Sequence, residues 1–530
     1  MIDVQSNILA SEGARVARAR YPYVLLAILC ILIVTYKLFI QHGLAGALLL
    51  LIVAATAFFG LLDFLYRSRG NGGRRSEMHS LAVVSFVLTL LLGEFGSATE
   101  SNITFLVSVW KLLILVLLCF VVRADSAHRF VLLRSVVRNP VASAFVLTVC
   151  AVLLTSTLQL IVLDVSVKGC IRAITFYGSL LAALYCAVGL LRQKADFALA
   201  RTVFRWVLLI LIGFAIFEMI SGFHLPTSWL NGDDPTALAK QNQIAGRGIW
   251  ITATGPCYNQ NDFCLILAVI GCLSLPSRGE SRFRFVTALV LVTLDLVLVA
   301  SLGSTIVSMG MLAAVALWGL AFQWRLRFKT AWITCAVAGV FFVSGVFFAQ
   351  IGVLAELVQG SSSAATGPAA GSTAVLNDFA VQSATYEQGY GSMWMRLTLY
   401  QQLISSIGAN PLGVGPASIH AFLTENPTAS GLIDPHNWWL EFALEYGWIP
   451  ALLYVSFNIL LVIKLLRCRE ACDGYTLSIC AALCAMYVGS IAPSSSDFNV
   501  LLWIPVLLGC AFLLSPMGRC VGPDRLLDRG

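Results

Sequence analysis

Charged residues are scarce in this sequence. Asp, Glu, Lys and Arg make up only 12% of the 530 residues, about half the share found in soluble domains. Nearly uncharged runs of about 18 residues or more recur from end to end, and each could cross the roughly 30 Å apolar core of a bilayer. The runs lack the polar–apolar alternation of membrane strands, which excludes a β-barrel. The sequence therefore predicts an all-α polytopic membrane protein.

Closely spaced pairs of metal ligands are also missing. The chain has 15 cysteines, but most lie within apolar runs, where cysteine behaves as a small hydrophobic residue. Cys468 and Cys472 are too far apart to form a CxxC pair. We therefore expect no metal site, no redox site and no cofactor.

The apolar runs predict about 14 spanning helices, within a range of roughly 12 to 14. The first run follows Arg15, Arg18 and Arg20 and is too long for the apolar part of a cleaved signal peptide, so we expect it to span the membrane. The expected spans are 21–40, 43–62, 80–97, 104–122, 141–163, 173–191, 204–222, 262–276, 285–302, 305–323, 331–355, 437–463, 475–492 and 499–515.

Basic residues predict the orientation of these spans. With the N-terminus in the cytoplasm, most of the 34 Lys and Arg residues fall on cytoplasmic segments, as the positive-inside rule requires. Both termini are then cytoplasmic. Because the arginines are spread over many short segments, we expect no nucleic-acid partner. The basic residues outside these segments are Lys37, Lys111, Lys168, Arg172, Lys240, Arg247 and Arg396.

Two connections on the predicted outer side are long, and connections of such length are usually functional. Within the second one, residues 392–408 carry apolar side chains at helical spacing, which predicts a short helix at the membrane surface. The expected parts of the chain are N-terminal helices (1–222), an outer loop (223–261), central helices (262–355), a large outer loop (356–436), and C-terminal helices with a cytoplasmic tail (437–530).

The stretch DPHNWW places polar residues where the large loop meets an apolar run. We expect Asp434 to cap this helix with Pro435 at its first position, so that His436 and Asn437 lie in the first turn. A helix start favours a bound anion and disfavours imidazolium. A neutral His436 beside an anion could act as a general base. The alternative is an ordinary helix start, anchored at the membrane interface by its histidine and tryptophans.

Two arginines on the same side could bind phosphate. Arg247 lies between two glycines, and Arg396 lies at the edge of the apolar stripe of 392–408. A guanidinium can bind phosphate through two parallel hydrogen bonds; either arginine could instead contact lipid headgroups.

Polar residues also open the expected span 262–276. Asn259, Asn261 and Asp262 could cap that helix, which is the role we expect for Asp262, or could bond to sugar hydroxyls.

Three blocks of residues resemble the O-antigen ligase and O-antigen polymerase superfamily of bacterial envelope glycan enzymes. The first has the pattern HN-x-x-L-E-x-x-x-E-x-G, the second is an arginine followed by NPLGVGP, and the third is G-x-x-x-N-x-N. The first pattern is matched by His436, Asn437, Leu440, Glu441, Glu445 and Gly447. The second is matched by Arg396 with 410–416, and the third by Gly255, Asn259 and Asn261. Two positions depart from the family: Gln260 stands where proline is usual, and Thr305 stands where an arginine is frequent.

The resemblance implies a membrane-embedded, type-C-like glycosyltransferase that inverts the sugar and needs no metal. Its donor would be a glycan linked to undecaprenyl pyrophosphate in the bacterial inner membrane, with the active site on the periplasmic side. The implied roles are general base for His436, donor binding for Arg247, Arg396, Asn437, Asn259 and Asn261, and support for Glu441 and Glu445. Metal-dependent relatives carry an acidic motif in the first outer loop, which here is only QHG; Asp233 and Asp234 are a weak alternative.

Three activities remain open at this point. A polymerase would join lipid-linked repeat units into an O-antigen or exopolysaccharide, with a chain-length regulator as a further partner. A ligase would transfer a glycan to lipid A-core or another acceptor. A flippase would move the lipid-linked glycan, and Lys111, Glu94, Glu218 and Asp295 could then form a proton path; the alternative for these residues is a buried structural pair. The polar loops and the lack of a visible inverted repeat favour an enzyme, and we expect a polymerase.

Overall fold

The computed structural model describes the helical bundle and part of its outer segments. The described residues are 72–91, 109–126, 130–163, 165–221, 253–255, 259–277, 280–302, 304–326, 391–427, 437–468, 474–491 and 499–516, together with His224, Ser228, Cys257 and Pro435. These residues contain helices and no strand, which confirms the all-α prediction for this part of the chain.

The helices follow the apolar runs of the sequence. Their bounds are α2 (Gly72–Leu91), α3 (Val109–Ser126), α4 (Val131–Arg138), α5 (Pro140–Val162), α6 (Val167–Leu190), α7 (Lys194–Ser221), α9 (Gln260–Leu273), α10 (Arg282–Ser301), α11 (Thr305–Leu326), α14 (Gly391–Ala409), α15 (Ile419–Glu425), α16 (Trp438–Tyr446), α17 (Trp448–Arg467), α18 (Tyr475–Gly489), η2 (Val500–Trp503) and α19 (Ile504–Leu514).

Five helices are long and apolar enough to cross a membrane, namely α5, α6, α7, α10 and α17. Shorter apolar helices cover five of the other expected spans: His79–Leu91, Gln260–Leu273, Ile306–Ala321, Tyr475–Gly489 and Val500–Leu514. The spans expected at 21–40, 43–62 and 331–355 lie outside the described residues. The total of about 14 spans therefore stays a prediction.

Two helices form the centre of the bundle. All residues of α9 from Phe263 to Leu273, and all of α19 from Ile504 to Leu513, are buried. The helices around them leave large apolar side chains exposed, among them Ile161 of α5 and Ile459 of α17. Apolar outer faces are expected for helices that contact lipid.

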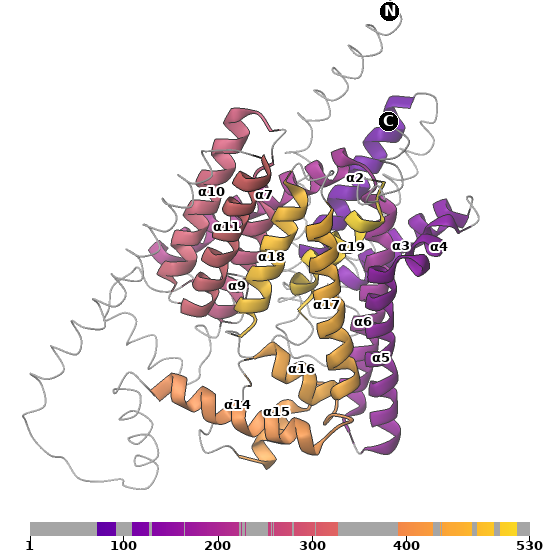
Figure 1. The fold of residues 1–530 in the computed structure, drawn as a ribbon, viewed down its shortest axis with the longest axis vertical. Coiled ribbons are helices and arrows are strands. Elements are labelled where there is room, and N and C mark those ends of the chain that lie inside the picture. The colour runs from indigo at the N-terminus through magenta and orange to yellow at the C-terminus, as the bar shows by residue number, and fades with distance from the viewer. Residues whose placement is uncertain are drawn as a thin grey trace, which may run out of the picture.

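The helix ends collect at two opposite ends of the bundle. At one end, Glu280 pairs with Arg201 (3.1 Å) and Arg205 (2.9 Å), and Asp196 pairs with His79 (3.0 Å). These residues belong to, or directly follow, segments that the arginine pattern assigns to the cytoplasm. At the other end lie α14, α15 and α16 (Figure 1).

The helix α4 lies in a connection where no helix was expected, and Asp125 fixes it to the bundle. The Asp125 carboxylate accepts hydrogen bonds from Leu132 N (2.9 Å), Leu133 N (3.3 Å) and the Tyr185 hydroxyl. Burial alone would raise the pKa of Asp125, but these hydrogen bonds, with Arg192, hold it below its ordinary value.

A depressed pKa of Asp125 predicts pH-dependent stability. An aspartate in the unfolded chain has a pKa of about 4, and the folded pKa of Asp125 lies below that value. Asp125 therefore stabilises the fold above the unfolded pKa, and this contribution is lost as the pH falls through the folded pKa. We expect Asp125→Asn to lower the melting temperature at pH 7, and we expect the difference from wild type to shrink below about pH 4. Thermal unfolding of the purified protein between pH 7 and pH 3.5 measures this. The neighbouring exposed Ser126→Ala variant is the control; equal shifts at every pH would contradict the prediction.

Candidate functional site

The start of α16 carries the His-Asn block. Asn437 is the N-cap of this helix, and its Oδ1 accepts hydrogen bonds from Trp439 N (3.0 Å) and Leu440 N (3.3 Å). The expectation that Asp434 caps the helix is therefore wrong: the amide of Asn437 takes that role. Asp434 and His436 lie outside the described residues; in the sequence, His436 directly precedes the cap.

The span expected at 437–463 is interrupted. Gly447, with φ 79°, ends α16, and α17 begins at Trp448. The hydropathy is continuous across this position, so only the glycine signals the break. The consequence is that the His-Asn block stands on a short separate helix, apart from the long spanning one.

The last turn of α18 joins the His-Asn block to the start of α9. Trp438 N donates to Ser490 O (3.0 Å), and Trp439 Nε1 donates to Tyr487 O (3.2 Å). On the other side, Gly489 packs so closely on Leu265 that a Cβ there would lie 2.6 Å from its Cδ1. The helices α9 and α16, which carry parts of two blocks of the resemblance, therefore both pack on the same end of α18.

The start of α9 is held by Asn259 and Gln260. Asn259 is the N-cap, and its Oδ1 accepts from Asp262 N (3.0 Å). Of the three residues expected to be able to cap this helix, Asn259 does so, and the capping role expected for Asp262 is wrong. Gln260 Nε2 donates to Leu302 O in the turn between α10 and α11. Gln260, which stands where the family usually has proline, thus links the start of α9 to the end of α10. Asn261 is half-buried in the first turn.

The NPLGVGP segment packs on the end of α16 through its backbone. Val414 N donates to Leu444 O (2.8 Å), Gly415 N to Glu445 O (3.2 Å), and Trp448 N to Pro411 O (3.1 Å). One amide of α5 completes this junction: Gln159 Nε2 lies 2.6 Å from Leu412 O and 2.7 Å from Glu445 O. Sequence reasoning missed Gln159, although a lone amide near the end of an apolar run was its signal.

Glu441 and Glu445 lie on α16 and are each 1% exposed. A side chain buried on the bundle side of the helix can support the His-Asn block through packing and polar contacts. Their predicted supporting role is compatible with this placement, and the backbone of Glu445 already anchors the NPLGVGP segment.

The helix expected at 392–408 is α14, and it carries Arg396 in its first half. The side chain of Arg396 lies outside what the structure describes, and so does all of Arg247. The buried face of α14 differs from the expected stripe: Leu399 and Leu403 are buried, whereas Ile404 is 60% exposed. The buried side chains form a separate core with α15 and α16, comprising Leu399, Leu403, Ile407, Ile419, Leu423 and Leu444.

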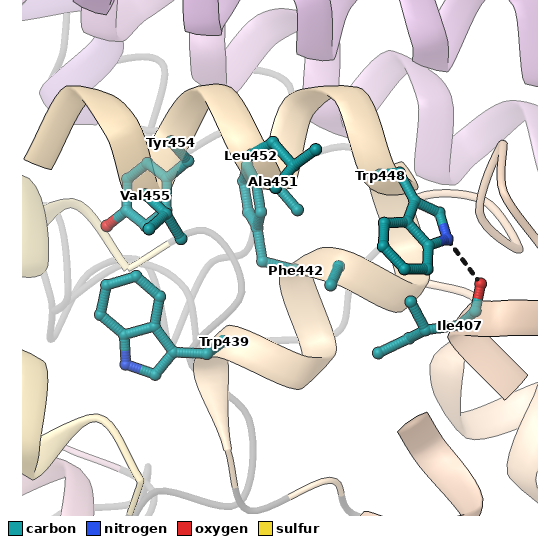
Figure 2. Close-up of a pocket in the computed structure, with 9 residues that line it drawn as sticks. Ile407, Trp439, Phe442, Trp448, Ala451, Leu452, Tyr454 and Val455 are labelled. Atoms are coloured by element: carbon teal, nitrogen blue, oxygen red, sulfur yellow. Dashed lines mark hydrogen bonds between the residues drawn. The ribbon is translucent and has the colours of Figure 1, made fainter. Parts of the chain in front are cut away.

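An apolar groove opens beside the His-Asn block. It has a volume of about 210 Å³ and lies between the end of α14, α16 and the first turns of α17 (Figure 2). Trp439, two residues after Asn437, lines one end, and Trp448 lines the other, where its Nε1 donates to Ile407 O (3.0 Å). The remaining lining residues are Phe442, Ala443, Ala451, Leu452, Tyr454 and Val455.

Comparison with known families confirms the resemblance found in the sequence. A model of the O-antigen ligase family matches residues 264–455, from the first turns of α9 into α17. This part of the chain is therefore similar to the O-antigen ligase family. The match includes Arg396, His436 and Asn437, whereas Arg247, Asn259 and Asn261 precede it. No curated protein matches the sequence.

The capping role of Asn437 can be separated from substrate binding. We expect Asn437→Ala to destabilise the protein by about 1 kcal/mol through loss of the cap, and Asn437→Asp to retain most of that stability. A thermal melt measures the cap, and a glycan-transfer assay measures the site. If Asn437→Asp keeps both stability and transfer, capping is the whole role of Asn437, and its predicted contact with the donor is contradicted.

Proposed function

We propose that this protein polymerises glycan repeat units carried on undecaprenyl pyrophosphate, at the periplasmic face of the bacterial inner membrane. The observation that supports this most is the position of the His-Asn block. It begins a short helix within the matched family region, α18 ties it to the start of α9, and an apolar groove lies beside it.

The groove suits the apolar part of such a donor. A polyprenyl chain needs an apolar surface, whereas its pyrophosphate and sugars need polar partners. The described groove offers the apolar surface. In this proposal the residues around Asn437, at the start of α16, offer the polar partners. In this proposal the donor lies with its isoprenoid chain along Trp448 and Leu452 and its pyrophosphate towards the start of α16.

The proposed reaction is a single displacement with inversion. The acceptor hydroxyl attacks the anomeric carbon while the bond from that carbon to the pyrophosphate oxygen breaks. His436 takes the hydroxyl proton, and the bond electrons leave with undecaprenyl pyrophosphate. Arg247 and Arg396 stabilise the charge that grows on this leaving group, so the reaction needs no metal ion.

The two long-loop regions then face the periplasm. The pairing of arginine-bearing segments at the opposite end of the bundle supports this orientation, because such segments stay in the cytoplasm. A chain-length regulator would contact the protein from the same membrane.

Two of the residues considered for a buried pair have other partners in the described part of the chain. Lys111 donates to Thr175 Oγ1 (3.1 Å), and the Glu218 carboxylate accepts from His224, Thr254 and Gly255. Within the described residues Glu218 therefore binds the outer segments and forms no ion pair with Lys111, and a flippase stays an alternative. Glu94 lies outside the described residues.

Purified protein with lipid-linked repeat units tests the proposal. Chain growth without ATP and in the presence of EDTA is the expected result. Transfer of the glycan to lipid A-core without chain growth would replace polymerisation with ligation. Movement of the lipid across a vesicle membrane without new glycosidic bonds would overturn enzymatic function altogether.

A further inference from the structure

A buried carboxylate joins two outer segments at the end of α7. Glu218 is completely buried. Its Oε1 lies 2.6 Å from His224 Nδ1, 3.1 Å from Thr254 N and 3.1 Å from Thr254 Oγ1, while its Oε2 accepts from Gly255 N at 2.8 Å. We call these residues, with Ser228, the Glu218 clasp.

The protons of the clasp can be assigned from its geometry. The Thr254 hydroxyl lies within reach of both Glu218 Oε1 and Ser228 Oγ (2.8 Å). It has one proton, so it donates to the carboxylate and accepts from Ser228. His224 Nδ1 lies against the same oxygen. Glu218 is thus surrounded by four polar partner atoms, three at Oε1 and one at Oε2.

The glycine of the family block is required by the clasp. Gly255 has φ 55°, and a Cβ there would lie 2.5 to 2.8 Å from three ring carbons of Phe263. In this conformation its N–H donates to Glu218 Oε2. Because Asn259 begins α9 four residues later, the clasp sets the path of the chain into that helix cap.

The clasp also joins the two ends of one loop. His224 follows α7, and Thr254 and Gly255 precede α9, so Glu218 holds the chain before and after residues 225–253. The sequence between these ends includes Arg247, which lies outside the described residues.

We propose that Glu218 is a positioning residue for the glycan-transfer site. By binding His224 on one side and Thr254 and Gly255 on the other, it fixes the approach of the chain to Asn259. The inference rests on the proposed function, since Asn259 is one of the residues proposed to hold the donor. It assigns a role to Glu218 and His224 that neither the blocks of the resemblance nor the matched region includes.

Donor kinetics test this role. Glu218→Gln keeps the side-chain shape, but its amide turns N–H groups towards N–H donors and leaves at least one of them unsatisfied. We expect KM for the lipid-linked donor to rise about tenfold or more while kcat falls less than about threefold. His224→Ala should act in the same direction, and His224→Gln, which keeps a donor, should lie close to wild type.

Thr254→Val provides a milder variant with a matched control. It removes the hydroxyl that bonds to Glu218 without changing the side-chain shape. Thr202→Val lies on the exposed side of α7, where its hydroxyl bonds only to Ala198 O of the same helix. A rise in KM for Thr254→Val and none for Thr202→Val supports the clasp. Equal KM values in all these variants, or a fall in kcat with KM unchanged, would overturn it.

Cys257 gives a readout that does not depend on activity. It is 2% exposed, and its N–H donates to Thr254 O (3.0 Å). A membrane-impermeant maleimide, followed by peptide mass spectrometry of the full-length protein, should label Cys257 about tenfold faster in Glu218→Gln than in wild type. Unchanged labelling contradicts the clasp. Wild-type protein that transfers no glycan would instead contradict the proposed function, and the labelling would still decide whether the clasp holds this segment.

Discussion

His436→Ala is expected to abolish glycan transfer while the protein reaches the membrane at normal abundance. A positioned general base contributes about a hundredfold to ten-thousandfold in rate, and the sequence places His436 directly before the cap of α16. Alanine cannot take the proton of the acceptor hydroxyl. The measurement is the rate of chain growth with lipid-linked repeat units, normalised to the amount of folded protein.

A second histidine near the same end of the bundle provides the control. His420 is exposed on α15, within the same outer region and the same family match. His420→Ala should leave chain growth within about twofold of wild type, since surface substitutions rarely change a protein strongly. Normal chain growth in His436→Ala at normal abundance would refute the catalytic role of His436.

Gly447→Ala is expected to cause the largest loss of stability. Gly447 has φ 79° and ψ −175°, a region almost reserved for glycine. An added Cβ would also lie 2.4 Å from Pro411 O, which is backbone and cannot move aside alone. The strain alone costs about 1 to 3 kcal/mol, and the overlap adds to it. We expect a strongly lowered melting temperature or loss of the protein from the membrane.

Substitutions of two other glycines provide a comparison and a control for Gly447→Ala. Gly413, with φ 80°, faces Gly447 across the junction, and a Cβ there would lie 2.4 Å from Glu445 O, so Gly413→Ala should be comparably damaging. Gly408 lies in α14, and nothing is within 4 Å of its Cβ position. Gly408→Ala should be neutral or stabilising by up to about 1 kcal/mol. Equal melting temperatures for Gly447→Ala and Gly408→Ala would contradict the close backbone contact.

Sequence reasoning predicted the helices that consist of long apolar runs. Helices such as α5, α10 and α18 follow directly from their composition, because a bilayer accepts few other structures. The short helix α14 followed from its spacing. Its buried face did not, because α15 and α16 decide that face, and their positions are set by contacts between distant parts of the chain.

The residue types of the candidate site could be predicted from the sequence, whereas most of its geometry could not. The blocks around Asn259 and Asn437 could be found from motifs, but both asparagines turned out to cap helices in place of the expected aspartates. Local propensity favours both residue types as caps, so the backbone path had to decide. Glu218 and Gln159 stand out only as polar residues in apolar runs, and their partners are far along the chain or across a long loop, so no local pattern predicts what they bind.

The bond between Gln159 and the NPLGVGP junction constrains the order in which the protein is made. Its partners lie 253 and 286 residues later in the chain. While the ribosome synthesises those residues, α5 already sits in the bilayer with a polar amide that has neither carbonyl to bind. An unpaired amide in hydrocarbon costs several kcal/mol. Gln159 lies three residues before the end of α5, where water can bind the amide until α16 is made, so this junction is among the last parts of the fold that can close.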